Sequence, residues 1–540
     1  MNEECTRSWP LEIFLKTWHP FFWIILTCFL LYSQTISYDF SYLDDHKLIV
    51  NNYTFLKNPA NISRTLTEDI FRLEESSNSY YRPLYVISFM LDAWMGGKSP
   101  WIYHLTNLIA HAIASCLLFT FLSKLGHKSG PAFFFSLIFA VHPVATQTVC
   151  WIPARNDSFL AVFVLSSFIF FSDFLKKGRR HDYVFHLVFL VLALFMKESA
   201  LALIPICILY VLILERPSFP KIRTKKSAIE EGIRLLSSRI LAIEWLVIAA
   251  SWYILRMKAL NNLPENNLVD ATMALLISVP GIIQLFGKTL LPFNLSVLPT
   301  FQDTVLLYGY IAILIISITL FLTKQKCHRH IIWGFLWFLC FLLPSFALPD
   351  ISKDVRLMEH RMYLPAIGLI LVWLETDLVK KPNLWKKKVP ILDFIILIVF
   401  SCITFAHSQV FRNRKVFWES AVKTAPHSSL AHGNVGVIYY LEGQADRAEK
   451  EYLKSLELNP LQSRPHINLG IIYMEKNNFL EAEREFKTAI RINPQLDMAY
   501  YHLGLLYHKW GKEGEAMASW KKMQELNPQF LDIYKGSEVQ

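Results

Sequence analysis

The sequence predicts an all-α protein, in which a polytopic membrane helix bundle of about eleven spans is followed by a C-terminal α-solenoid of helical repeats. Three observations lead to this fold class. Only 18% of the 540 residues are charged and 53% are hydrophobic, whereas soluble domains carry about a quarter charged residues. Apolar segments long enough to cross a bilayer recur up to residue 408. Beyond that point the chain becomes polar and periodic, so we expect a membrane domain over 1–408 and a repeat domain over 409–540.

The charge of the connections predicts the side of the membrane on which each one lies. The apolar segments cover residues 20–36, 99–123, 130–145, 157–174, 182–196, 198–214, 238–257, 304–323, 330–346, 360–377 and 389–407. Short basic turns such as SKLGHKSG (123–130) and TKQKCHRH (323–330) are expected to stay cytoplasmic. Strict alternation then places the first long loop, residues 37–98, and the repeats on the extracytoplasmic side.

Two further helical segments are expected on that outer side. Residues 82–97 are typical of an interfacial helix. Residues 271–292 carry Pro280 at their middle and have to begin and end outside, which favours a re-entrant or surface-lying hairpin. The first apolar segment is interpreted as a retained anchor.

The net charge of +10 is explained by these basic turns, so no nucleic-acid partner is predicted. The eight cysteines lie mostly in apolar segments and show no CxxC spacing, so they predict neither a zinc site nor a disulfide framework. No cofactor is certain, and a divalent cation remains possible.

After residue 408 several residue types recur every 34 positions. They are Gly436, Gly470 and Gly504; Tyr439, Tyr473 and Tyr507; Ala448, Ala482 and Ala516; and Pro460, Pro494 and Pro528. This is the register of tetratricopeptide repeats, in which small residues let two helices approach and the proline ends the second. A half repeat with Trp418 and Ala421 precedes them. Such repeats form a groove for an extended peptide or protein partner, although they can also serve as a spacer.

Charged and hydrogen-bonding residues gather at the predicted outer ends of the spans, where a functional role is the default hypothesis. The acidic pair Asp44 and Asp45 follows the first span directly. The local alternatives stay open: an acidic loop may simply be solvated, and neighbours such as Lys197 and Glu198 can form ion pairs with each other. His104, Asn107 and His111 share one face of a helix, which favours a structural hydrogen-bonding face over a metal site.

Taken together, acids and bases on one membrane face indicate a site that accepts an anionic, lipid-linked substrate and moves protons. The sequence contains no GxSxG, Walker, HExxH or strand-associated GxGxxG motif. Nucleotide-sugars are made inside the cell, so a donor on the outer face has to arrive attached to a lipid. A polyprenyl-phosphate sugar needs a carboxylate to deprotonate the acceptor hydroxyl and cations to stabilise the leaving phosphate.

The ordered motifs YLDD, YRPL, HLTNLIAH, FAVHPV, WIPARND, KES, LLPFNLS and EHRMYLP, followed by the repeats, resemble a known family. It comprises the transmembrane and tetratricopeptide-repeat-containing O-mannosyltransferases and their prokaryotic relatives, within the C-type glycosyltransferase superfamily. The resemblance covers essentially the whole chain. It implies an inverting integral-membrane glycosyltransferase that uses a polyprenyl-phosphate sugar, dolichyl-phosphate mannose in the animal members. The membrane would be a prokaryotic plasma membrane or the endoplasmic reticulum, with the repeats extracytoplasmic or lumenal.

Carried over position by position, the family's acidic motif falls on Asp44 and Asp45, which are the expected catalytic residues, with Asp44 favoured as the base. The residues expected to bind donor phosphate or substrate are Arg82, His142, Arg155, Asp157, Lys197, Glu359 and Arg361. The family pattern HPVHTE reads HPVATQ in this chain, with Ala145 and Gln147 in place of a histidine and an acid.

Two other functions remain open. An O-antigen-ligase-like or polymerase-like enzyme also has many spans and outer basic residues, but it does not place an acidic pair directly after the first span. A membrane-anchored repeat scaffold would need no catalytic carboxylate.

Overall fold

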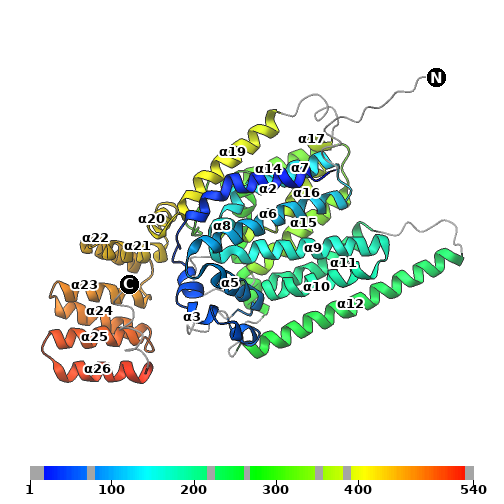
Figure 1. The fold of residues 1–540 in the computed structure, drawn as a ribbon. Helices are drawn as coiled ribbons and strands as arrows, with labels where there is room; N and C mark the ends of the chain where they lie inside the picture. Colours follow the sequence, from blue (N-terminus) through cyan, green and yellow to red (C-terminus); the bar gives the residue numbers. More distant parts are fainter. Residues whose placement is uncertain are drawn as a thin grey trace. The chain divides into compact units, whose positions relative to one another are not determined.

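The computed structural model describes residues 17–69, 80–215, 225–260, 268–346, 357–380 and 391–528, and it contains only helices, turns and loops over these ranges (Figure 1). The all-α prediction is therefore confirmed for the described part of the chain. Two compact units are present. The first comprises the described residues up to Arg414 except Ser296–Asp303, and the second comprises Ser296–Asp303 with the described residues from Lys415 onward.

The first unit is built from α-helices joined by short 3₁₀ and π turns. In chain order they are α2 (His19–Tyr32), η1 (Ser33–Ser37), η2 (His46–Val50), α3 (Tyr53–Leu56), η3 (Pro59–Asn61), α4 (Ile62–Thr65), α5 (Pro83–Gly96), α6 (Pro100–Lys124), α7 (Ser129–Val141), η4 (Pro143–Ala145), α8 (Thr146–Cys150), η5 (Ile152–Ala154), α9 (Arg155–Lys177), α10 (Arg180–Met196), η6 (Glu198–Ala202), α11 (Leu203–Ile213), α12 (Lys225–Ala259), α13 (Leu268–Lys288), α14 (Leu307–Leu322), α15 (His328–Leu342), η7 (Leu343–Ser345), η8 (Glu359–Met362), α16 (Ala366–Leu374), α17 (Asp377–Lys380), α19 (Ile391–Ser408) and η9 (Gln409–Phe411).

The prediction of about eleven spans is not supported. Over the described residues, four helical stretches are long and apolar enough to cross a membrane: His19–Ser37, Pro100–Lys124, Ile152–Lys177 and Asp393–Phe411. A fifth is reached if Ser129–Val141 and Pro143–Cys150, bent by 48°, count as one span. Several of the remaining apolar segments are cut short. Proline and 3₁₀ turns interrupt them, which leaves helices such as α11 with 11 residues and α16 with 9.

The hairpin predicted over 271–292 is also wrong, because α13 continues as a single helix through Pro280. The helix predicted over 82–97 is present as α5, which begins at Pro83 and ends before Gly97. A proline at the first helical position suits a helix start, since its missing N–H would have no intrahelical partner there.

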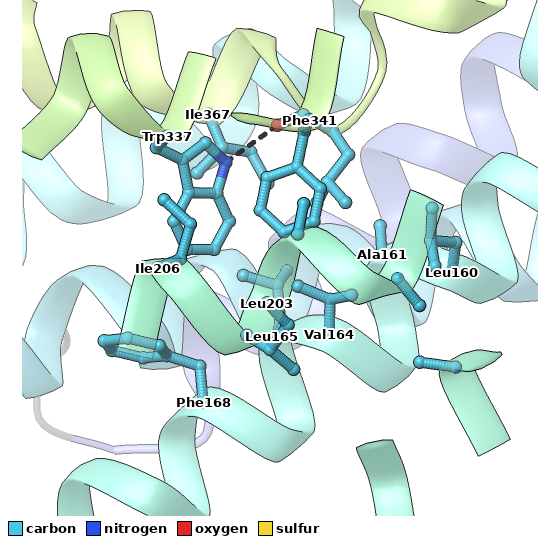
Figure 2. Packing of buried hydrophobic residues seen from close by; sticks show 14 of the residues in the cluster. Leu160, Ala161, Val164, Leu165, Phe168, Leu203, Ile206, Trp337, Phe341 and Ile367 are labelled. Atoms are coloured by element: carbon cyan, nitrogen blue, oxygen red, sulfur yellow. Dashed lines mark hydrogen bonds between the residues drawn. The ribbon is translucent and has the colours of Figure 1, made fainter. Parts of the chain in front are cut away.

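Aromatic and branched aliphatic side chains fill the core of the first unit (Figure 2). Val164 and Phe168 of α9 lie in one buried cluster with Ile206 of α11 and Trp337 of α15. The Trp337 indole donates a hydrogen bond of 3.0 Å to the Leu364 carbonyl, so the buried ring leaves no unpaired N–H. This packing fixes α9, α11, α15 and α16, and α9 carries Arg155 and Asp157 in its first turn.

The second unit is a stack of helical hairpins that follows α20 (Arg414–Thr424). The hairpin helices are α21 (Ser429–Leu441), α22 (Ala445–Leu458), α23 (Ser463–Glu475), α24 (Phe479–Ile492), α25 (Asp497–Lys509) and α26 (Glu513–Leu526). The recurring glycines are where the two helices of a hairpin meet: a Cβ on Gly436 or on Gly470 would lie 2.6 Å from the ring of Tyr452 or Phe486. The predicted period of 34 residues therefore corresponds to one hairpin.

Histidines tie successive hairpins together in this unit. His432 Nδ1 lies 2.6 Å from the Glu451 carboxylate, and its Nε2 lies 3.0 Å from the Pro426 carbonyl. One period later, His466 makes the same contacts with Glu485 at 2.6 Å and Pro460 at 3.3 Å. Each histidine thus links both helices of a hairpin to the proline that ends the hairpin before it.

The loop Ser296–Asp303 also belongs to this unit. The Ser296 and Thr424 hydroxyls are 2.8 Å apart, and the Asp303 carboxylate accepts from the backbone N–H of His427 at 3.1 Å. The repeats are thus joined to the preceding part of the chain at two places in the sequence.

We predict that Gly470→Ala destabilises the repeats by about 1–3 kcal/mol, since the added methyl group has to displace the buried Phe486 ring. Gly514→Ala is the matched control: its Cβ meets nothing within 4 Å, so the alanine should stabilise α26 slightly. Hydrogen–deuterium exchange of the full-length protein measures both, and faster exchange in α23 and α24 is expected only for Gly470→Ala. Equal exchange in the two variants would contradict the close packing.

We also predict that the repeats lose stability as the pH rises. Burial lowers the pKa of His432, but hydrogen bonds to Glu451 and Pro426 outweigh burial, so the net pKa is raised. A raised folded-state pKa stabilises the fold below the unfolded value of about 6.5, and this stabilisation is lost as the pH passes the folded value. Denaturant unfolding at a series of pH values measures the effect. If a His432→Gln variant kept the full pH dependence of unfolding, groups other than His432 would be responsible for that dependence.

Candidate active site

The acidic loop after the first span holds Asp45 in a buried setting. Asp45 is 1% exposed, and its Oδ2 accepts hydrogen bonds from the Ser41 backbone N–H at 3.1 Å and from the Ser41 hydroxyl. Burial raises the pKa of Asp45 to about 6; the Ser41 hydrogen bond opposes this shift and the charge of Asp44 adds to it. Asp44 is half-buried. The two neighbouring acids therefore differ in their access to solvent.

The backbone of this loop is attached to the segment that follows α19. The Asp39 N–H donates to the Arg412 carbonyl at 3.0 Å. The Arg414 guanidinium lies over the ring of Tyr42, 4.9 Å from its centroid. Tyr42 has φ 61°, a left-handed conformation that is uncommon for a residue with a side chain. Contacts across more than 370 positions thus fix the conformation of the acidic loop.

Two ion pairs lie at the junction of α10 and η6. Arg82, at the start of α5, binds Glu198 through two hydrogen bonds of 2.9 and 2.5 Å. Lys197 donates to both carboxylate oxygens of Asp157 at 2.7 and 2.8 Å. The adjacent Lys197 and Glu198 therefore each bind a partner far away in the sequence, so the alternative of local pairing between them is wrong.

His360 and Arg361 extend this charged cluster. His360 Nε2 lies 4.0 Å from Asp157, and its backbone N–H donates to the Gln147 side-chain oxygen at 3.1 Å. Arg361 donates to the Ser345 carbonyl at 3.0 Å. The charges of Lys197, Arg361 and Arg82 add to burial in holding the pKa of His360 well below its usual value. The three cations thus disfavour protonation of this partly buried histidine.

Glu359 is completely buried and binds Lys288, itself 2% exposed, at 2.7 Å. His407 Nε2 lies 3.3 Å from its other oxygen. Burial acts to raise the pKa of Glu359, but Lys288 and His407 outweigh burial and hold the pKa at about 2. His142 Nε2 lies 2.9 Å from the Thr289 carbonyl, directly after Lys288. These contacts connect α13, η8 and α19 next to the charged cluster.

The acidic loop and the cations share one electrostatic environment. Burial raises the pKa of the Tyr85 phenol; Arg82 opposes this shift, and Asp44 and Asp45 add to it. Tyr85 therefore senses both groups. The structure thus brings the predicted residues Asp44, Asp45, Arg82, Asp157, Lys197 and Arg361 into one region.

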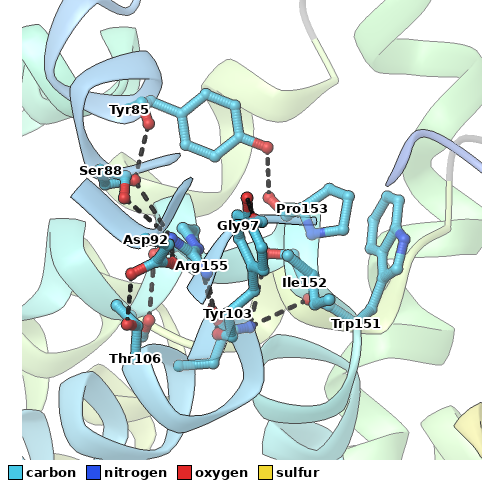
Figure 3. A network of polar contacts seen from close by, with 12 residues as sticks. Tyr85, Ser88, Asp92, Gly97, Tyr103, Thr106, Trp151, Ile152, Pro153 and Arg155 are labelled. Carbon is cyan, nitrogen blue, oxygen red and sulfur yellow. Dashed lines mark hydrogen bonds and ion pairs between the residues drawn. The ribbon is translucent and has the colours of Figure 1, made fainter. Parts of the chain in front are cut away.

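Arg155 has a network of partners of its own (Figure 3), and its charge also acts on Tyr85. The side chain has no exposed surface, and it binds Asp92 at 2.5 Å, the Asn107 oxygen at 3.0 Å and the Tyr103 carbonyl at 2.8 Å. Because these bonds occupy the guanidinium, the geometry favours a structural role for Arg155 over binding of a donor phosphate.

The predicted polar face of α6 lies inside the bundle. Asn107 donates towards the carbonyls of Val149 and Trp151 at 3.3 Å. His111 contacts the Tyr363 hydroxyl at 2.7 Å and the Ala140 carbonyl at 3.0 Å. The ring of His104 is buried and lies 6.2 Å from that of Tyr38.

Sequence reasoning missed several partners in these contacts. Asp92, Lys288 and His407 were not singled out, although an ionisable residue within an apolar segment is itself a signal. Which charges pair with one another depends on helix packing, and no local pattern contains that information.

A separate group of potential metal ligands occurs in the described part of the chain. Cys327, His330 and Glu375 place one ligand atom each within 4.8 Å of one another. They lie at the ends of α15 and α16 that are remote from Glu359 and Arg361.

Comparisons with known proteins agree with the two-part organisation. A family model described as dolichyl-phosphate-mannose-protein mannosyltransferase matches residues 83–229. Models described as TPR repeat and tetratricopeptide repeat match residues 470–511 and residues 430–460 and 499–530. The tetratricopeptide register predicted from the sequence is confirmed.

Curated relatives are similar over most of the chain or over a shorter part of it. Protein O-mannosyl-transferase TMTC3 of Homo sapiens is 25% identical over 462 residues, which cover 77% of this chain and 49% of the relative. Protein O-mannosyl-transferase F38B6.6 of Caenorhabditis elegans is 25% identical over 449 residues, which cover 79% of this chain and 61% of the relative. Protein O-mannosyl-transferase TMTC2 of Homo sapiens is 35% identical over 141 residues, which cover 26% of this chain and 17% of the relative. The chain thus spans less than two thirds of the length of these relatives.

We predict that Arg155→Met lowers the stability of the first unit by about 3–5 kcal/mol, because it leaves Asp92 buried and unpaired. The double variant Arg155→Met, Asp92→Asn removes both charges and should recover part of the loss. Thermal unfolding of the detergent-solubilised protein measures both variants. A double variant no more stable than the single one would show that the pairing of these charges is unimportant.

Proposed function

We propose that this chain is an integral-membrane glycosyltransferase of the family of tetratricopeptide-repeat-containing protein O-mannosyl-transferases. The matched family models and the curated relatives support this proposal. The enzyme moves mannose or another hexose from a polyprenyl-phosphate donor to a hydroxyl group of a protein or glycan acceptor. The reaction takes place at the extracytoplasmic or lumenal face, where the acidic loop and the repeats are both predicted to lie.

The observation that carries this proposal is the joint placement of acids and cations in one buried region. Arg82, Lys197 and Arg361 all act electrostatically on Asp157. Arg82 and the acidic loop both act on Tyr85. Burying a charged group costs free energy. A region that buries several charged groups is therefore a candidate for a substrate-binding or catalytic site.

The cations suit an anionic leaving group. Arg82 presents a planar fork that binds Glu198 bidentately, and the same fork matches two oxygens of a phosphate. Lys197 lies next to it in the sequence and supplies a compact charge. In the resting state the carboxylates of Glu198 and Asp157 neutralise these cations. A phosphate entering the region would compete with those carboxylates for the same N–H groups.

The transfer step balances without any further reactant. The acceptor hydroxyl oxygen attacks the anomeric carbon of the donor sugar while the bond from that carbon to the phosphate oxygen breaks. The hydroxyl proton passes to a carboxylate, and the electron pair of the broken bond leaves with the lipid phosphate, where the cations stabilise its charge. Attack from the face opposite the leaving group inverts the anomeric centre.

Asp44 is the proposed base, and Asp45 positions it. Asp45 is almost fully buried, and its Oδ2 is engaged by Ser41, so its carboxylate holds the turn from Ser41 to Asp45 together. Asp44 is half-buried and so keeps a surface that a substrate can reach.

The two units would divide the work. In this proposal residues 1–408 bind the lipid-linked donor and carry out the transfer, and residues 409–540 bind the acceptor protein or a partner along the groove of the repeats. His142 and Glu359 support the donor region through α13 and α19 and do not contact the phosphate themselves.

We predict that Asp44→Asn lowers the rate of hexose transfer by about 10²–10⁴-fold while binding of the donor is retained, because the base is lost and the cations remain. Asp45→Asn should lose less, since an amide oxygen can still accept from Ser41. Transfer from radiolabelled polyprenyl-phosphate hexose to acceptor proteins measures the rate.

Glu68→Gln is the matched control: it is an acid-to-amide change in the same predicted outer loop, at a partly exposed residue that pairs with Arg64. Its rate should equal that of the wild type. Full transfer activity in both Asp44→Asn and Asp45→Asn would rule out the proposed mechanism and favour a non-enzymatic scaffold.

A further inference from the structure

Three turns of the first unit bring metal-ligating side chains together at one end of the bundle. Cys327 is the residue before α15, His330 lies in the first turn of that helix, and Glu375 follows the last residue of α16. Their ligand atoms, the Cys327 sulfur, a His330 ring nitrogen and a Glu375 carboxylate oxygen, all lie within 4.8 Å of one another. The sequence CHRH separates the cysteine and histidine by three positions, which places both on one face of a helix start.

A fourth side chain reaches the same place from another turn. His127, in the connection between α6 and α7, has its ring centroid 5.8 Å from that of His330. Two imidazoles on one tetrahedral zinc ion, with bonds of about 2 Å, hold their centroids roughly 5 Å apart. The Nε2 atom of His127 is buried, and it has no hydrogen-bond partner among the residues that the structure describes. A buried ring nitrogen without a partner is expensive unless something binds it.

We propose that Cys327, His330, Glu375 and His127 form a zinc-binding site. One thiolate, two imidazoles and one carboxylate are the donor types that zinc prefers, and four of them complete a tetrahedron. The ligand atoms of Cys327, His330 and Glu375, which lie within 4.8 Å of one another, would have to approach to about 3.5 Å, the edge of such a tetrahedron, and the His127 ring would have to turn towards them. That movement is within the reach of side-chain rotation.

The charges of the site balance on binding. His330 Nδ1 lies 2.9 Å from one Glu375 oxygen. Zinc binding would release the proton of the Cys327 thiol, and the thiolate and the carboxylate would then neutralise its two charges. The Cys327 backbone N–H, which donates to the other Glu375 oxygen at 3.1 Å, would keep the carboxylate oriented. Lys380 also binds that oxygen and would stay beside it.

This site lies at the far ends of the helices that carry the candidate active site. His111 and Asn107 lie in the body of α6, whose last residue is Lys124, shortly before His127. Glu359 and Arg361 precede α16, whereas Glu375 follows it. The ion would therefore be structural: it would hold the ends of α6, α15 and α16 in register and would not touch the reacting groups.

The test uses purified full-length protein that has been stripped with a chelator and then titrated with zinc against a coloured competitor. One zinc ion per chain is expected. Cobalt(II) as a probe should give a thiolate-to-metal charge-transfer band. Cys327→Ser should abolish that band and weaken zinc binding by at least about 100-fold, and His127→Ala should weaken binding while keeping the band.

Two variants serve as matched controls. His328→Ala removes an exposed histidine from the same turn, and Cys402→Ser removes an exposed cysteine from α19. Both should bind zinc like the wild type. Binding far below one ion per chain in the wild type would overturn the site, as would unchanged binding in Cys327→Ser. If Cys327→Ser does not fold, the cobalt spectrum of the wild type decides: a spectrum without a thiolate band rules the site out.

Discussion

The pairing of Lys197 with Asp157, next to that of Arg82 with Glu198, is the constraint on which the rest of the first unit depends. Each charge costs several kcal/mol to remove from water, and only a close partner offsets this cost. The four residues come from α5, α9 and the junction of α10 with η6. Those elements therefore have to meet in one arrangement. The same pairs keep the cations in place in the absence of any ligand.

The surrounding network extends this principle to the other helices. Arg155 and Asp92 fix α5 against α9, and Lys288, Glu359 and His407 connect α13, η8 and α19. None of these pairs has to bind substrate to be useful. Each one specifies a helix position that apolar packing alone would leave adjustable, because aliphatic side chains can slide past one another at little cost. The buried polar groups thus form a frame around the reactive region.

The fold class and the repeats could be predicted from the sequence, since both depend on patterns that local physics dictates. The glycines at 436, 470 and 504 recur because a hairpin has no room for a Cβ there. The number of spans could not be predicted. The hydropathy of the sequence shows how long an apolar segment is, but it does not show where a proline such as Pro143 ends a helix. Apolar segments that form short helices were therefore counted as full membrane spans. Among the candidate site residues, Asp44, Arg82 and Lys197 could be singled out because acids and bases at predicted span ends stand out, and their roles stay predictions. The contacts of Arg155 with Asp92, and of Cys327 and His330 with Glu375, could not be predicted, because these partners lie far away in the sequence.

The most direct measurement of the central claim follows the donor itself. Purified protein is given a polyprenyl-phosphate hexose with an acceptor protein, and the released lipid and the anomeric configuration of the product are determined. The proposed function requires one lipid monophosphate released per glycosidic bond formed, and a product whose anomeric configuration is opposite to that of the donor. Transfer only from a lipid-diphosphate glycan, or a product that retains the donor configuration, would contradict it.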